Sequence, residues 1–214
     1  MGWNSPRDLS KMKTAPERPP APPRIESLSE IGRAWLEHWW GLPHEGLLPL
    51  RSIFDPAAVP KLLPYLEMHD LREPGRSLLR LVGTHVAARY GKDPTGLDYL
   101  DFVAPERREE AYLGVLVPAS HPCGMRVVMT TYFESGLHTR IEAVGLPMTF
   151  DAAGGRIFMF SDMVIGELPH TWTEPGRLTR YELHERSSSI LVRAFLMNRS
   201  IHNIAQCPRA DIWE

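Results

Sequence analysis

The polar residue with the clearest chemical implication is Arg80, which lies inside the apolar stretch LLRLVG at residues 78–83. A buried guanidinium needs an anionic or carbonyl partner, because an unpaired charge in an apolar environment is very unfavourable. Arg80 could therefore point into a cleft and hold an anionic ligand, which is the functional hypothesis. Alternatively, Arg80 could form an internal salt bridge or face solvent on a sheet. We favour this second interpretation over the ligand-binding one. Glu142 and Asp162 are the candidate carboxylate partners.

Other side chains that could line a ligand pocket share a position in or beside an apolar segment. With Arg80, the candidates are His85, Tyr90, Tyr112, Arg140, Glu142, Phe158 and Asp162. The aromatic candidates Tyr90, Tyr112 and Phe158 are more often core residues than pocket lining. Asp162 and Glu142 would support catalysis only if a cleft shifted their pKa.

Recognisable motifs for catalysis, metal binding and cofactor binding are missing from the sequence. It contains no GxGxxG, GxxxxGK[ST], HExxH or GxSxG pattern. Cys123 and Cys207 are far apart and form no CxxC pair, so we expect both to be reduced. The sequence therefore predicts no catalytic residue, no metal ligand and no enzymatic activity, and it leaves the cofactor unknown.

Composition narrows the partners and the location. The 214 residues carry a formal net charge of −2, so no basic surface points to nucleic acid. No apolar run is long enough to span a membrane, and the first residues lack the apolar core of a secretory signal. We therefore expect a cytoplasmic protein. Residues 1–24 are rich in proline and are expected to form a disordered tail.

A helix rich in tryptophan is predicted to follow this tail. Its start resembles a capping box of Ser27 and Glu30, and Gly41 and Pro43 end it. Its apolar stripe consists of Leu28, Ile31, Trp35 and Trp39. Exposed aromatic stripes mark interfaces, so we interpret these four residues as the surface of a homodimer.

The remaining elements indicate an α+β domain. Strands at 66–71 and 77–82 form a hairpin, a short helix runs from Gly83 to Tyr90, and a longer helix follows Ala104. Residues 124–166 read as a meander of three antiparallel strands. The prediction is a five-stranded antiparallel sheet with helices on one face, within a domain at 25–166 that includes the N-terminal helix. Residues 167–214 form a C-terminal extension with a helical stripe at 190–201.

Several segments in this order resemble a PAS domain, and more specifically the small single-domain PAS proteins of alphaproteobacteria. They are FDPAAVPKLLPYLEMHDL, LLRLVGTHVAARYG and KDPTGLDYLDF, and the resemblance covers about residues 28–166. It implies a sensory or protein-interaction module that binds small molecules in a cleft between sheet and helices, or binds other PAS domains. Flavin-adduct PAS domains carry a cysteine in the region matching 89–100, and the best-known haem PAS domains a histidine in the region matching 105–118. Both residues are missing here.

The leading hypothesis is a non-catalytic PAS-type sensory or interaction module. It would bind a small ligand or a signalling protein and signal through association, as a homodimer. One alternative is a small-molecule enzyme with Asp162 or Glu142 in its cleft. Another is a scaffold with a filled core and no ligand.

Overall fold

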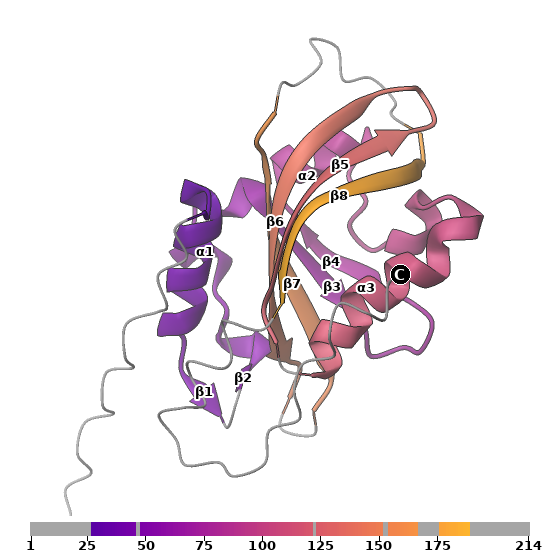
Figure 1. Cartoon of the computed structure of the whole chain (residues 1–214). Helices are drawn as coiled ribbons and strands as arrows, with labels where there is room; N and C mark the ends of the chain where they lie inside the picture. The colour runs from indigo at the N-terminus through magenta and orange to yellow at the C-terminus, as the bar shows by residue number, and fades with distance from the viewer. Residues whose placement is uncertain (1–26, 46–47, 122, 152–153, 167–175, 189–214) are drawn as a thin grey trace, which may run out of the picture.

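The computed structural model describes residues 27–45, 48–121, 123–151, 154–166 and 176–188, which form two layers of helices around one antiparallel sheet (Figure 1). The sheet has the strand order β4-β3-β7-β6-β5-β8. Its strands are β3 (Leu66–Asp70), β4 (Leu78–Val82), β5 (Met125–Phe133), β6 (His138–Thr149), β7 (Arg156–Val164) and β8 (Leu178–Ser188). All of its pairings are antiparallel. The α+β class and the antiparallel sheet are thus confirmed.

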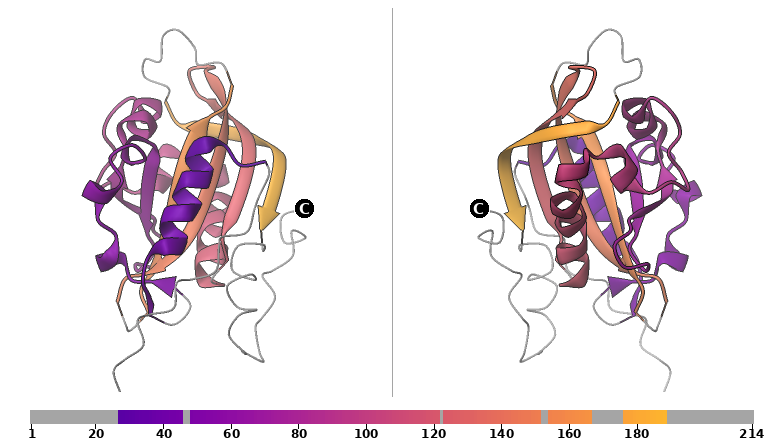
Figure 2. Two further views of the ribbon diagram at one scale, coloured as in Figure 1. Left: turned by 90° about the vertical axis from the view of Figure 1, so that its left-hand side faces the viewer. Right: turned by 90° about the vertical axis from the view of Figure 1, so that its right-hand side faces the viewer.

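The helical elements lie on both faces of this sheet. Figure 1 shows α1 on one face and α3 on the other, and Figure 2 shows the two faces in turn. The α-helices are α1 (Glu30–Gly41), α2 (Thr84–Tyr90) and α3 (Arg108–Ser120). Short 3₁₀ turns are η2 (Arg51–Ile53), η3 (Pro56–Ala58), η4 (Leu63–Tyr65), η5 (Tyr99–Phe102) and η6 (Pro105–Arg107), and a small hairpin joins β1 (His44–Glu45) to β2 (Leu48–Pro49).

The aromatic stripe of α1 packs against the chain's own sheet. Trp35 and Trp39 are 0% and 1% exposed, Leu28 is buried, and Ile31 packs at the edge of the same apolar cluster. The indole nitrogen of Trp39 donates to the carbonyl of Pro147 in β6 at 3.0 Å. The prediction that these residues form an exposed dimer surface is therefore wrong, because β6 and β7 already cover the stripe. The cap is also displaced: Ser29, not Ser27, accepts from the amide of Gly32 at 3.1 Å.

The C-terminal extension contributes a sixth strand. We expected helical structure after residue 166, but β8 pairs with β5 along its whole length. Tyr181 and Leu183 line a cavity beside α3, although Leu183 is still 46% exposed, and Arg180 and Glu182 are exposed, so β8 is a largely exposed edge strand. The predicted tail at 1–24 and the helical stripe at 190–201 lie outside the described residues.

The cysteine prediction and the hydropathy prediction have different outcomes. Cys123 is disulfide-bonded, so the expectation of a reduced thiol is wrong for this residue; Cys207 lies outside the described residues. Within the part of the chain that the structure describes, no helix has the length and apolarity needed to cross a membrane.

Candidate functional site

A cavity of about 480 Å³ lies between the sheet and the layer formed by α2, η5 and α3. Its apolar wall comes mainly from alternate residues of the central strands, including Met125, Val127, Met129, Ile141 and Phe160. The small residues Gly114 and Ala111 of α3, with Ala143 of β6, leave space across the cavity. A chamber of this size, apolar with a few polar groups, has the properties of a small-molecule site.

One end of the cavity holds a buried cluster of charged side chains. Glu67 and His69 project from β3, and their Oε1 and Nε2 atoms are 2.5 Å apart. The Tyr90 hydroxyl of α2 donates to Oε2 of Glu67 at 3.0 Å. Arg89 Nη2 contacts Asp162 Oδ2 of β7 at 2.5 Å. The second carboxylate oxygen of Asp162 is buried without a hydrogen-bond partner among the described residues.

These surroundings shift the pKa values of the Glu67 and Asp162 carboxyl groups in opposite directions. Burial alone would raise the pKa of Glu67, but the charge and hydrogen bond of His69, assisted by Arg89, hold it below its usual value. Burial raises the pKa of Asp162, and the charge of Arg89 offsets this only in part. Burial also raises the pKa of Tyr90 well above its usual value. This end therefore contains an ionised Glu67, a protonated tyrosine and a carboxyl group that retains its proton more readily than a free aspartate.

The other end of the cavity is polar as well. Arg107 pairs with Glu110 of α3 at 2.8 Å, and its guanidinium lies 4.6 Å from the ring centroid of Tyr181 in β8. The Tyr181 hydroxyl is hydrogen-bonded to Glu110. Nε of Arg107 is buried and has no hydrogen-bond partner among the described residues. Asp162 and Arg107, which both line the cavity, thus each carry a buried polar atom without a hydrogen-bond partner among the described residues.

Ser77, His69 and Glu67 form a hydrogen-bonded chain that resembles a serine-histidine-acid arrangement. Ser77 Oγ is 2.8 Å from Nδ1 of His69, whose Nε2 contacts Glu67. Ser77 is 0% exposed and does not line the cavity, so no substrate can reach its hydroxyl. The chain instead fixes the orientation of the imidazole within the polar end.

Only two of the eight predicted pocket residues line this cavity, namely Tyr90 and Asp162. Tyr112 and Phe158 belong to the apolar cluster beside it. His85 is exposed and packs edge-on against Tyr65, as expected of a packing histidine. Arg140 is exposed on β6. The pocket role is therefore wrong for these four residues.

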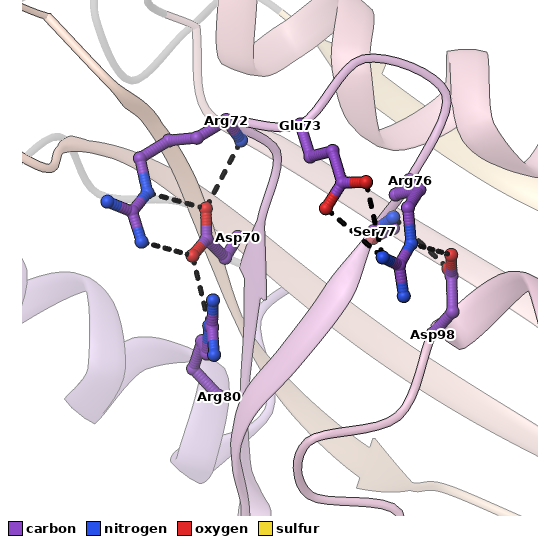
Figure 3. Close-up of polar contacts among 7 residues, drawn as sticks. All are labelled: Asp70, Arg72, Glu73, Arg76, Ser77, Arg80 and Asp98. Carbon is purple, nitrogen blue, oxygen red and sulfur yellow. Dashed lines mark hydrogen bonds and ion pairs between the residues drawn. The ribbon is translucent and has the colours of Figure 1, made fainter.

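Arg80 lies on the opposite face of the sheet from the cavity. Its Nε donates to Oδ2 of Asp70 at 3.0 Å, and Arg72 forms two side-chain hydrogen bonds with the same carboxylate (Figure 3). The hypothesis that Arg80 enters the ligand cleft is wrong, and the internal salt bridge is the correct alternative. The predicted partners were also wrong, because Asp70 on the adjacent strand is closer than either carboxylate of the meander.

The ion pairs of Asp70 make stability depend on pH. Burial would raise its pKa, but the hydrogen bonds of Arg72 and Arg80 lower it from 3.8 to about 2. Its stabilising contribution is complete above pH 3.8 and disappears as the pH falls through about 2. We expect Asp70→Asn to be less stable than wild type, with a difference that shrinks over this interval. Urea unfolding at a series of pH values checks this, and a constant difference would contradict it.

Glu142 also faces away from the cavity, toward α1. It forms a buried ion pair with Arg126 at 3.0 Å and accepts from the backbone amide of Ser29 at 2.9 Å. The pocket role predicted for Glu142 is therefore wrong. The enzyme alternative required Glu142 or Asp162 in the cleft; only Asp162 is there, and it is paired with Arg89. The alternative of a filled core disagrees with the cavity.

Sequence reasoning missed Glu67, His69, Arg89 and Arg107. The signal was present in LEMHDL, where Glu67 and His69 alternate with Leu66 and Met68. Such alternation usually marks a strand with one solvated face. Here helices cover both faces, so the polar face becomes the lining of a cavity.

A family model described as a PAS domain matches residues 26–157. No curated protein matches the chain. Among solved structures, the Vibrio cholerae VqmA dimer is 14% identical with a TM-score of 0.41, over 52% of each chain. The Rhodobacter sphaeroides LOV protein is 13% identical with a TM-score of 0.39, over 53% of this chain and 70% of that one. The chain spans about half the length of VqmA. Because the matched family model covers more than half of the 214 residues, this protein belongs to the PAS domain family.

Proposed function

We propose that this PAS chain is a non-catalytic sensory module that binds a small molecule in the cavity and signals through a change in association. The observation that carries the proposal is the cavity of about 480 Å³, whose two polar ends each retain an unused hydrogen-bonding atom. A scaffold with a filled core would have neither an open cavity nor buried polar atoms without partners, since buried polar atoms are normally hydrogen-bonded. A signalling protein partner would bind a surface that changes when the ligand binds.

The lining supports a largely apolar ligand with polar groups at its ends. A donor on the ligand would satisfy the free oxygen of Asp162, and an acceptor would satisfy Nε of Arg107. Met125, Met129 and Phe160 add an apolar surface to the lining. A highly charged ligand does not fit this interior, because desolvation of its charges would oppose binding.

Strand β6 is the proposed route for the signal, because its neighbouring residues face opposite layers. Ala143 lines the cavity, while Glu142 binds the backbone and hydroxyl of Ser29, which caps α1. A ligand that displaced β6 would therefore shift Glu142 and alter its hydrogen bonds to Ser29 at the start of α1. Because the Trp35 face is occupied by the sheet, a homodimer would use another surface. The homodimer, the cytoplasmic location and the alphaproteobacterial subfamily remain predictions from the sequence.

The experiment uses Gly114 of α3, where an added side chain has room to enter the cavity. A Cβ at this position meets no atom within 4 Å. Gly114→Trp should fill the cavity without unfolding the protein, whereas Gly114→Ala adds one methyl group and stabilises the helix by about 1 kcal/mol. Binding of the neutral probe N-phenyl-1-naphthylamine is measured by fluorescence, and native mass spectrometry with an absorption spectrum reveals any molecule that copurifies.

We expect saturable probe binding to wild type and Gly114→Ala, and its loss in Gly114→Trp at unchanged circular dichroism. Light scattering with and without the probe tests the change in association. Probe binding that is equal in the alanine and tryptophan variants would show that the ligand site is elsewhere. A wild-type protein of bare mass that also fails to bind the probe would favour docking over sensing.

A further inference from the structure

A second concave site lies on the opposite face of the sheet, away from the cavity. It is a groove of about 710 Å³ between β3, β4, η2 and the turn after β6. Three arginines line it, namely Arg51, Arg72 and Arg80, together with the carboxylates of Asp70 and Asp151. The formal charge of this set is therefore +1, and the three cations come from three separate elements.

Asp70 holds two of these arginines in fixed orientations (Figure 3). Arg72 donates to Asp70 from Nε at 2.9 Å and from Nη2 at 2.7 Å, and Arg80 donates from Nε at 3.0 Å. Arg72 also stacks on Phe150, with its guanidinium carbon 3.4 Å from the ring centroid. The Asp70 side chain is 3% exposed, whereas those of Arg80 and Arg72 are 46% and 38% exposed. A buried anion thus anchors two cations whose free edges reach the groove.

Most of the donors in the groove are unused by the described part of the chain. Nη1 and Nη2 of Arg80 take part in no hydrogen bond or ion pair with the described residues, because Nε alone contacts Asp70. The side chain of Arg51 makes no hydrogen bond or ion pair with the described residues. Planar guanidinium groups with free paired N–H donors match the oxygens of phosphate and carboxylate groups.

We propose that this groove binds a phosphate group through Arg51, Arg72 and Arg80. Phosphate is favoured over carboxylate because the three guanidinium groups come from three elements, and a phosphate presents oxygens in more directions than the two coplanar oxygens of a carboxylate. The site is independent of the ligand in the main cavity, which lies across the sheet. Inorganic phosphate and a phosphorylated small molecule share the recognised chemistry.

Arg76 on the same hairpin provides a matched control. Its Nη1 binds both carboxylate oxygens of Glu73, at 3.2 and 3.1 Å, and its Nε binds Asp98 at 3.1 Å. Figure 3 shows this cluster beside the Asp70 cluster. Arg76 does not line the groove. Its removal changes the net charge as much as the removal of Arg51 does, without removing a proposed ligand contact.

The test is a titration of the full chain with inorganic phosphate at constant ionic strength, followed by the arginine Nε–H signals in NMR spectra. We expect saturable shifts of the groove arginines, and about tenfold weaker binding in Arg51→Ala and Arg80→Ala. Arg76→Ala should change the affinity by less than about twofold. Arg51→Ala removes no side-chain hydrogen bond or ion pair with the described residues, so its folding, followed by circular dichroism, should be unaffected. A parallel titration with a phenyl phosphate monoester distinguishes a phosphorylated ligand from the free ion.

Three results would overturn the proposal. One is a set of shifts that stay linear in phosphate, which means an adventitious ion only. Another is a loss of affinity in Arg76→Ala as large as in Arg51→Ala, which means non-specific attraction. The third is equal saturation by acetate, which removes the preference for phosphate. Loss of probe binding in the main cavity would leave this site unaffected, so the two proposals fail separately.

Discussion

Replacing Gly83 with alanine is expected to destabilise the protein by about 3 kcal/mol or more. A Cβ at this position would lie 2.1 Å from the carbonyl oxygen of Leu63 and 2.3 Å from the carbonyl carbon of Pro64. These are backbone atoms, so no side-chain rotation can relieve the overlap. The Gly83 amide also donates to Leu66 at 2.8 Å, and its carbonyl accepts from Ala87 at 2.8 Å. Moving the glycine away would break the junction between β3 and α2.

Urea unfolding of Gly83→Ala measures this loss, and Gly41→Ala is the matched control. Gly41 ends α1, and a Cβ there meets no atom within 4 Å. The control should differ from wild type by less than about 1 kcal/mol. If Gly83→Ala were as stable as Gly41→Ala, the close contact of β3, η4 and α2 at this point would be incorrect.

At Gly83, the local sequence predicts the element boundary but not the tertiary contact that requires a glycine. The pattern predicted the end of a strand and the start of a helix there, and both are confirmed. The reason for the glycine was not predictable, because its φ of −70° is open to any residue. Close approach to Leu63 and Pro64 requires the glycine, and that approach arises only when the elements pack.

Elements defined by their own residues were predicted well. The strands β3 and β4 and the short helix α2 lie where the sequence placed them. Errors arose where a tertiary partner decides the outcome. Trp35 looks like an interface residue until β6 and β7 are placed against it. The strand β8 was missed because its pairing with β5 supplies the order that its polar sequence does not indicate.

The candidate site was predicted only in part, for the same physical reason. Of the candidates, Tyr90 and Asp162 line the cavity. The hypothesis that put Arg80 in the cleft was wrong because alternation along a short strand does not say which face is the cavity. A register shift in the pairing of β3 with β4, between Met68 and His69, further disturbs that alternation.

Replacing Arg126 with methionine is expected to cost about 3–5 kcal/mol, since it leaves the carboxylate of Glu142 buried without its cation. The side chains of Arg126 and Glu142 are 8% and 2% exposed, with Nε and Oε2 3.0 Å apart. Arg126 also binds Glu185 of β8 at 2.7 Å and the carbonyl of Ser27 at 2.9 Å. The guanidinium therefore joins β5, β6, β8 and the segment before α1.

A double-mutant cycle separates the ion pair from the volume of the side chain. Arg126→Met with Glu142→Gln should regain part of the lost stability, because the amide is neutral and its oxygen can still accept from Ser29. Arg76→Met, which breaks the pairs of an exposed arginine with Glu73 and Asp98, should cost much less stability than Arg126→Met, because solvent screens these pairs. Free energies of unfolding in urea are measured for wild type, Arg126→Met, Glu142→Gln and the double variant, which close the cycle, and for the Arg76→Met control. If the double variant were less stable than Arg126→Met alone, packing and not the unpaired charge would dominate. The interactions of Glu142 would then contribute little to the stability of the contact between β6 and α1.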